Sequence, residues 1–157
     1  MYRYGKLTQN AVAALSRLAE AFGEGEGWLS AVDIARSRNL PGPALAKILT
    51  VLAQGGLVVG FRGPTGGYRL ARPPATITLL HVVQLFERPD DEALGCPFGP
   101  GWCGRGAPCP YHDRITRLRQ DMLDYLQNTD FGAFHKNAAP HSGSAKGAGP
   151  KSRKRRG

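Results

Sequence analysis

Three cysteines and a histidine are grouped in one short stretch of the chain. Cys96, Cys103, Cys109 and His112 have the spacing C-x6-C-x5-C-x2-H, and the 157 residues contain no other cysteine. This odd number argues against a framework of structural disulfides. Thiolates together with an imidazole are instead ligands that suit zinc or an iron–sulfur cluster.

The composition of the same stretch supports a bound metal. Residues 95–110 include five glycines and four prolines, which form no regular element and bury little apolar surface. We therefore expect metal binding to order this loop. The residue types leave zinc open, because a Cys3His set can close a tetrahedral site. The spacing comes near the C-x8-C-x5-C-x3-H pattern of RNA-binding CCCH zinc fingers, although two of the three gaps differ.

The elements that position this loop begin with two predicted helices. Apolar residues recur at helical spacing from Leu15 to Phe22 and predict an amphipathic helix over residues 11–22. Ser30 and Asp33 have the capping-box spacing, in which the hydroxyl accepts a backbone N–H and the carboxylate reaches back. A short helix over residues 31–38 should follow.

A third helix and a hairpin complete the predicted DNA-binding unit. Pro43 suits the first position of a helix, because its missing N–H has no partner there. Two β segments then flank a Gly/Pro turn, and Arg62 and Arg69 lie at their ends. Two short helices, a turn and a basic hairpin make a winged helix-turn-helix, in which the hairpin is the wing. The third helix presents one apolar face: Leu45, Ile48, Leu49 and Leu52.

The later part of the chain predicts two more helices and a tail. Residues 77–86 form a candidate buried helix, in which His81 is expected to be a packed side chain. A long helix over about 111–128 carries a seam that could pair with a second copy of itself. Its members are Tyr111, Ile115, Leu118, Met122 and Tyr125. The expected organisation is a folded part over 1–135 and a disordered basic tail over 136–157.

The positive charge is unevenly distributed. The chain has a formal net charge of +9, of which the seven basic residues from 136 onward account for +7. Residues 28–72 carry six basic side chains against Asp33 alone, so the predicted helix-turn-helix and hairpin are basic. This placement indicates a polyanionic partner.

Several motifs resemble one family. They are Trp28-Leu29-Ser30, Asp33-Ile34-Ala35, Leu45-Ala46-Lys47-Ile48-Leu49, Gly56-Leu57-Val58 and above all Arg62-Gly63-Pro64-Thr65-Gly66-Gly67-Tyr68-Arg69-Leu70-Ala71. Together they resemble the winged-helix core of the IscR/NsrR-type bacterial transcription regulators, from about Lys6 to Leu126. The resemblance implies a homodimer that binds double-stranded DNA at a partly palindromic operator.

The resemblance also implies a cofactor. Cys96, Cys103 and Cys109 correspond to the cluster ligands of that family, and His112 to the histidine that completes the site in its [2Fe-2S] members. Members with a [4Fe-4S] cluster recruit an aspartate near the N-terminus. This chain has no Asp or Glu before Glu20, which favours [2Fe-2S] over [4Fe-4S].

The third helix and the hairpin supply the expected DNA contacts. At the start of the helix Ala44 and Ala46 occupy positions where such regulators place polar groups, so Lys47 and Thr50 are the nearest polar candidates. We therefore expect more reliance on wing, phosphate and DNA-shape contacts. The expected DNA-binding residues are Ser30, Pro43, Ala44, Lys47, Thr50, Arg62, Gly63, Thr65, Gly66, Gly67 and Arg69.

The expected fold is mainly α with a small β-hairpin: a winged helix-turn-helix plus a long C-terminal dimerisation helix. The expected function is that of a transcription regulator, a repressor, whose operator binding depends on an iron–sulfur cluster that senses cluster status, redox or nitric oxide. The alternative is a zinc-stapled Cys3His winged-helix protein without redox sensing. No catalytic constellation stands out, which argues against an enzyme. No run approaches the ~18 apolar residues of a membrane span, and a cytoplasmic location is expected.

Overall fold

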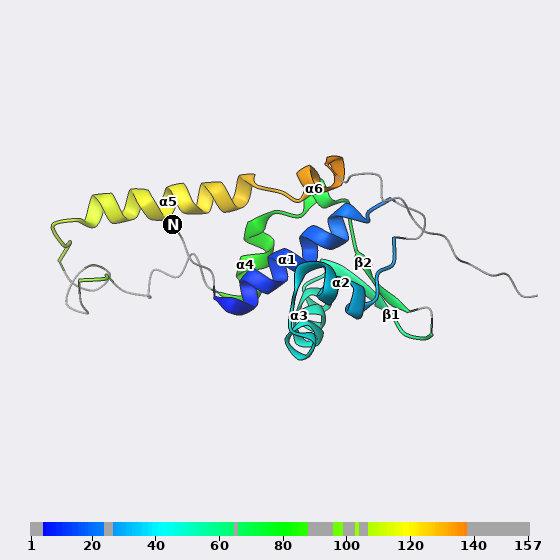
Figure 1. Ribbon diagram of the computed structural model, residues 1–157. Helices are drawn as coiled ribbons and strands as arrows, with labels where there is room; N and C mark the ends of the chain where they lie inside the picture. The colour runs from blue at the N-terminus through cyan, green and yellow to red at the C-terminus, as the bar shows by residue number, and fades with distance from the viewer. Residues whose placement is uncertain are drawn as a thin grey trace, which may run out of the picture.

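The computed structural model describes residues 5–23, 27–64, 66–87, 96–98, 103 and 107–137. Within them the chain is mainly helical, and its strands form one two-stranded antiparallel hairpin (Figure 1), which confirms the predicted fold class. In chain order the elements are α1 (Lys6–Glu20), α2 (Ala31–Arg38), α3 (Gly42–Gln54), β1 (Val58–Phe61), β2 (Gly67–Leu70), the 3-10 turn η1 (Pro74–Thr76), α4 (Leu79–Phe86), α5 (His112–Asn128) and α6 (Gly132–Lys136).

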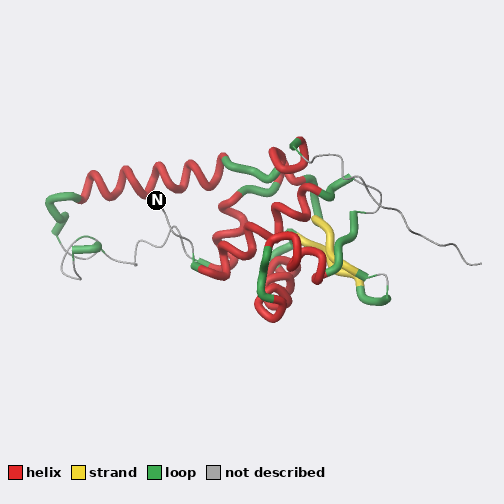
Figure 2. Tube along the Cα trace, viewed as in Figure 1, coloured by secondary structure: helices red, strands yellow, loops and turns green. Residues whose placement is uncertain are grey.

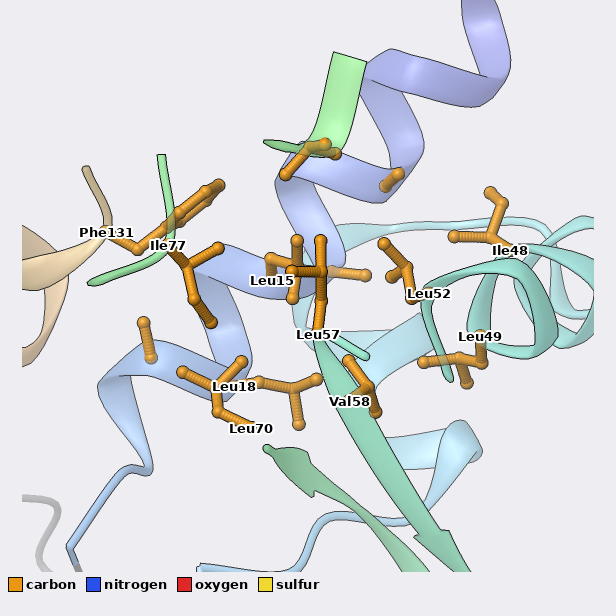
Figure 3. Close-up of a cluster of buried hydrophobic side chains, with 14 of the residues drawn as sticks. Leu15, Leu18, Ile48, Leu49, Leu52, Leu57, Val58, Leu70, Ile77 and Phe131 are labelled. Atoms are coloured by element: carbon orange, nitrogen blue, oxygen red, sulfur yellow. The ribbon is translucent and has the colours of Figure 1, made fainter. Parts of the chain in front are cut away.

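The core lies where α1, α3 and the base of the hairpin meet. Leu15 and Leu18 of α1 point toward Leu52 of α3 and toward Val58 and Leu70 of the strands (Figure 3). The four apolar residues predicted on the third helix are all buried: Leu45, Ile48, Leu49 and Leu52. Each such side chain contributes about 1.5–3 kcal/mol of burial free energy, which explains why short helices are stable here.

The helix-turn-helix is held by one capped end and one ionic contact. The Ser30 hydroxyl accepts the Asp33 N–H at 3.1 Å and donates to the Asp33 carboxylate at 2.6 Å, so the carboxylate reaches back to the hydroxyl. At the other end, Arg38 donates to Ser16 Oγ at 3.1 Å and to Glu20 Oε1 at 2.5 Å. Arg38 therefore holds α2 against α1, and its charge is neutralised by Glu20.

The hairpin has a buried face and an outer face. Val58 pairs with Leu70, and both are buried, whereas the next pair, Val59 and Arg69, is exposed. Gly67 has no room for a side chain, because a Cβ there would lie 2.6 Å from the carbonyl oxygen of Leu29. Leu29 and Tyr68 exchange two backbone hydrogen bonds, which fixes the segment before α2 alongside β2.

The prediction for His81 is wrong. Its imidazole is exposed, and its Nδ1 accepts the Thr78 N–H at 3.0 Å, while the Thr78 hydroxyl caps the His81 N–H. The ring thus completes the N-terminal capping box of α4. The apolar neighbours of His81 belong to the other side of this short helix, where Val82 and Val83 are buried.

The long helix α5 extends beyond the core on the side opposite to the hairpin (Figures 1 and 2). Its C-terminal part is anchored in the core: Leu126 is buried, Met122 packs against the core, and Phe131 beyond the helix is also buried. The sequence did not predict α6, which follows Phe131 and includes Lys136. The rest of the predicted tail, residues 138–157, lies outside the described residues.

Candidate metal centre and nucleic-acid interface

The three cysteines meet at the N-terminal end of α5. The Sγ atoms of Cys96, Cys103 and Cys109 all lie within 4.8 Å of one another, although up to six residues separate neighbouring cysteines in the sequence. Cys109 is buried, and the other two are partly exposed. The described backbone supports this arrangement, since the Cys103 N–H donates to the Ala107 carbonyl at 2.9 Å and Cys103 takes a left-handed φ of 58°.

His112 is the first residue of α5 and lies against one of these thiols. Its Nδ1 is 3.2 Å from Cys103 Sγ, and its N–H donates to the Cys109 carbonyl at 2.9 Å. This distance is that of a hydrogen bond between the imidazole nitrogen and the sulfur, and the tautomer of the ring decides which of the two is the donor. The structure therefore groups the three cysteines of the predicted metal set and places His112 against one of them, Cys103.

The three thiols differ in acidity for physical reasons. Hydrogen bonds from the backbone of Cys109 and then from the His112 side chain lower the pKa of Cys103 to about 7. Burial raises the pKa of Cys109 to about 11. A metal that binds the Cys109 thiolate would therefore have to displace a tightly held proton. The donor set is soft and closely grouped, which fits one metal or one cluster and does not distinguish between them.

An exposed apolar stripe begins beside this site. Tyr111, Leu118 and Tyr125 recur every seven residues along α5 and are 50%, 71% and 58% exposed. Tyr111 stacks on Phe98, with 5.2 Å between the ring centroids. Phe98 belongs to the segment that runs from Cys96 to Cys109, the cysteine segment. The seam predicted from the sequence is thus unburied in the single chain, except for Met122 and Ile115, which are partly buried.

The predicted recognition helix presents few polar groups. α3 begins at Gly42, so Pro43 is its second residue, one position later than predicted. Lys47 and Thr50 are exposed, but the Thr50 hydroxyl donates to the Ala46 carbonyl at 3.0 Å. Ala44 is partly buried, and the Ser30 hydroxyl is engaged in capping α2. Of these residues, Lys47 is the one with a charged side chain directed to solvent.

The predicted glycines of the wing have backbone roles. Gly63 has a φ of 134°, which L side chains rarely adopt, and its carbonyl accepts the Gly66 N–H at 2.9 Å. A Cβ on Gly66 would collide with the Phe61 carbonyl. These residues shape the turn that carries the exposed Arg62. Thr65 lies outside the described residues.

Arg69 is placed differently from Arg62. Its guanidinium carbon lies 4.6 Å from the centroid of the Trp28 ring, a cation–π contact at the base of the wing. Trp28 in turn lies 6.0 Å from Phe61, ring centroid to ring centroid. The sequence did not predict this cluster of Trp28, Phe61 and Arg69. The alternation of the hairpin could have, because it puts Phe61 and Arg69 on one face.

Comparison with known proteins gives one consistent match. The family model Rrf2, described as an iron-dependent transcriptional regulator, matches residues 5–137. An HTH-type transcriptional regulator of Neisseria meningitidis serogroup A is 36% identical over 117 residues, covering 74% of this chain and 76% of the relative. IscR of Vibrio vulnificus is 32% identical over 100 residues, covering 64% of this chain and 58% of the relative.

Two solved structures have a similar fold. CymR, the global cysteine regulator of B. subtilis, has a TM-score of 0.69 at 24% identity and covers 87% of this chain and 98% of its own. T. potens IscR has a TM-score of 0.67 at 24% identity, with coverages of 92% and 93%. Among the described residues, no helix is both long and apolar enough to cross a bilayer.

Proposed function

Because the chain belongs to the Rrf2 family of transcription regulators, we propose that it is a homodimeric repressor whose DNA binding depends on an iron–sulfur cluster. DNA-binding regulation, without enzymatic activity, is what the family establishes. The finer proposal depends on one observation: the sulfur atoms of Cys96, Cys103 and Cys109 lie within 4.8 Å of one another. Three free thiols gather this closely when they share one metal centre or react with one another, and their odd number leaves one unpaired in any disulfide.

His112 is the proposed fourth ligand of a [2Fe-2S] cluster. Its Nδ1 lies 3.2 Å from Cys103 Sγ, one of the three thiols, which supports this role. When bound, such a group supplies a centre that reacts with oxidants and nitric oxide, and histidine ligation raises its potential. The chain contributes the ligands, a hydrogen bond that favours the Cys103 thiolate, and a buried position for Cys109.

The proposed route from this centre to DNA is the dimer geometry. His112 and Cys109 stand at the start of α5, and the exposed stripe Tyr111, Leu118 and Tyr125 runs along the same helix. Two copies that pair through this stripe would set the spacing of their α3 helices. A palindromic operator needs that spacing to be about one DNA turn, ~34 Å, so a change at the start of α5 would change affinity. Lys47 and Arg62 would then contact DNA.

The deciding experiment is anaerobic purification, followed by iron and sulfide quantification and a visible spectrum. We expect a brown protein with equal iron and sulfide that bleaches in air or nitric oxide. Cys96→Ala should lose this absorption. His112→Ala should shift or lose it, whereas His135→Ala, outside the site, should not. A colourless protein with tightly bound zinc would refute the cluster and favour the zinc-stapled alternative.

DNA binding is tested on the same preparations. Fragments selected from a random pool with cluster-bound protein are titrated with cluster-bound and cluster-free protein. We expect the two affinities to differ by at least about tenfold, a coupling within the ordinary allosteric range. Identical affinities on every selected fragment would show that the cluster does not regulate binding.

A further inference from the structure

A cavity lies behind the wing, away from the cysteine site. It has a volume of about 400 Å³ and lies between the end of α1, the base of the hairpin and the segment that follows β2. Small-molecule sites occupy about 300–1,000 Å³, so this cavity is of a size that holds a small ligand. Its apolar lining includes Leu18 and Phe22 of α1 and Val59 of β1.

Two arginines line the same cavity. Arg69 contributes from β2, paired across the hairpin with Val59, and Arg72 contributes from the turn after β2. The acidic side chain nearest in sequence on α1, Glu20, is already bound to Arg17 and Arg38. Among the described lining residues the charged side chains are these two arginines, and both are positive.

Arg72 has an unused donor. Its Nε is buried, and no described residue accepts a hydrogen bond from it. A buried donor without a partner is destabilising, the more so when it is charged, so such atoms are uncommon unless a ligand or solvent satisfies them. Guanidinium groups form paired hydrogen bonds with the two oxygens of a carboxylate. Arg69 keeps its guanidinium on the Trp28 ring, which leaves its hydrogen-bonding edge available.

We propose that this cavity binds a small organic acid, with its carboxylate on Arg72 and Arg69 and its short apolar body against Leu18, Phe22 and Val59. The two positive charges of Arg69 and Arg72 favour an anion. The apolar wall favours a ligand with a hydrocarbon part over an inorganic ion. The site is separate from the cysteines and from α3. Binding is measured on the protein without DNA or cluster loading, so failure of the repressor proposal leaves this test unaffected.

The probe is hexanoate, titrated by calorimetry and by Trp28 fluorescence in a Trp102→Phe background. We expect saturable binding, a change in Trp28 emission, and binding at least about tenfold weaker for 1-hexanol, which lacks the charge, and for inorganic phosphate, which lacks the apolar body. Arg72→Met keeps the apolar stem of the side chain and should weaken hexanoate binding about 10- to 100-fold. Arg36→Met, which removes an exposed arginine of α2, should leave it unchanged.

Three results would overturn the proposal. The first is no saturable hexanoate binding to a protein whose thermal unfolding shows that it is folded. The second is equal hexanoate affinity in Arg72→Met and Arg36→Met. The third is that Arg72→Met lowers the salt dependence of DNA binding by about one phosphate contact while no organic acid binds, which would assign Arg72 to the DNA backbone.

Discussion

Leu118 provides the sharpest test of the dimer proposal. Its side chain is 71% exposed in the single chain and lies in the middle of the stripe on α5. Full burial of a leucine contributes about 1.5–3 kcal/mol, so burial of the exposed share contributes about 1–2 kcal/mol per subunit. A twofold interface contains two copies, and Leu118→Ala should therefore cost about 2–4 kcal/mol of dimerisation free energy.

This loss corresponds to a dimer dissociation constant raised roughly 30- to 1,000-fold. Sedimentation equilibrium over a concentration series measures it, and unfolding of the monomer should change by less than about 0.5 kcal/mol, because the side chain is exposed there. Val32→Ala is the matched control: Val32 is 62% exposed but lies on α2. A dissociation constant within threefold of the wild type for Leu118→Ala would refute pairing through this stripe.

Three further predictions concern stability and salt dependence. Partial desolvation of the exposed ring and then the charge of Arg72 lower the pKa of His81, so the stability that His81 contributes is full above its unfolded pKa of about 6.5 and declines as pH falls through the lower folded value. Thermal unfolding at pH 7.5 and 5.5 should show a pH-dependent loss of at most about 1 kcal/mol that His81→Gln reduces; equal loss in both proteins would contradict the cap. Gly67→Ala should destabilise the protein by about 1–3 kcal/mol in denaturant unfolding, because its Cβ would lie 2.6 Å from the Leu29 oxygen, whereas Gly42→Ala, with open space around it, should be near neutral. Removal of residues 138–157 should reduce the salt slope of DNA binding, since they hold six basic side chains; an unchanged slope would exclude a DNA role for the tail.

Capping residues and apolar spacing, which are local in the sequence, predicted the helix-turn-helix. They did not predict contacts between residues far apart in the chain. The Ser30 cap and the four-residue apolar face of α3 are local patterns, and both occur as predicted. Arg38 was counted as one of six basic residues available to a polyanion, yet it bonds Ser16 and Glu20 of another helix. The contact spans up to 22 positions, so only the packing of α2 on α1 reveals it.

The candidate site shows the same division. The spacing of Cys96, Cys103, Cys109 and His112 predicted a donor set, because ligand type is a property of the residues themselves, and the three sulfur atoms do lie close together. The role of Arg69 depended on tertiary structure: Trp28 precedes α2 and reaches the arginine only because Leu29 pairs with Tyr68. His81 was misplaced for a related reason. An eight-residue helix has both a buried and an exposed side, and apolar neighbours in sequence do not determine which side a histidine takes.

Glu87 adds a second connection between the cysteine segment and the DNA-binding unit. Its carboxylate oxygen accepts the Gly5 N–H at 2.6 Å and the Thr8 hydroxyl at 2.5 Å, so the residue that ends α4 holds the N-terminus of α1. α1 forms the core together with α3, the predicted recognition helix. The chain enters the cysteine segment after Glu87 and leaves it through α5, whose far end is buried at Leu126. The residues that flank the segment, Glu87 and α5, are thus both attached to the body that carries α3. In the proposed function, a rearrangement of the cysteine segment would therefore act on this body through Glu87 as well as through α5.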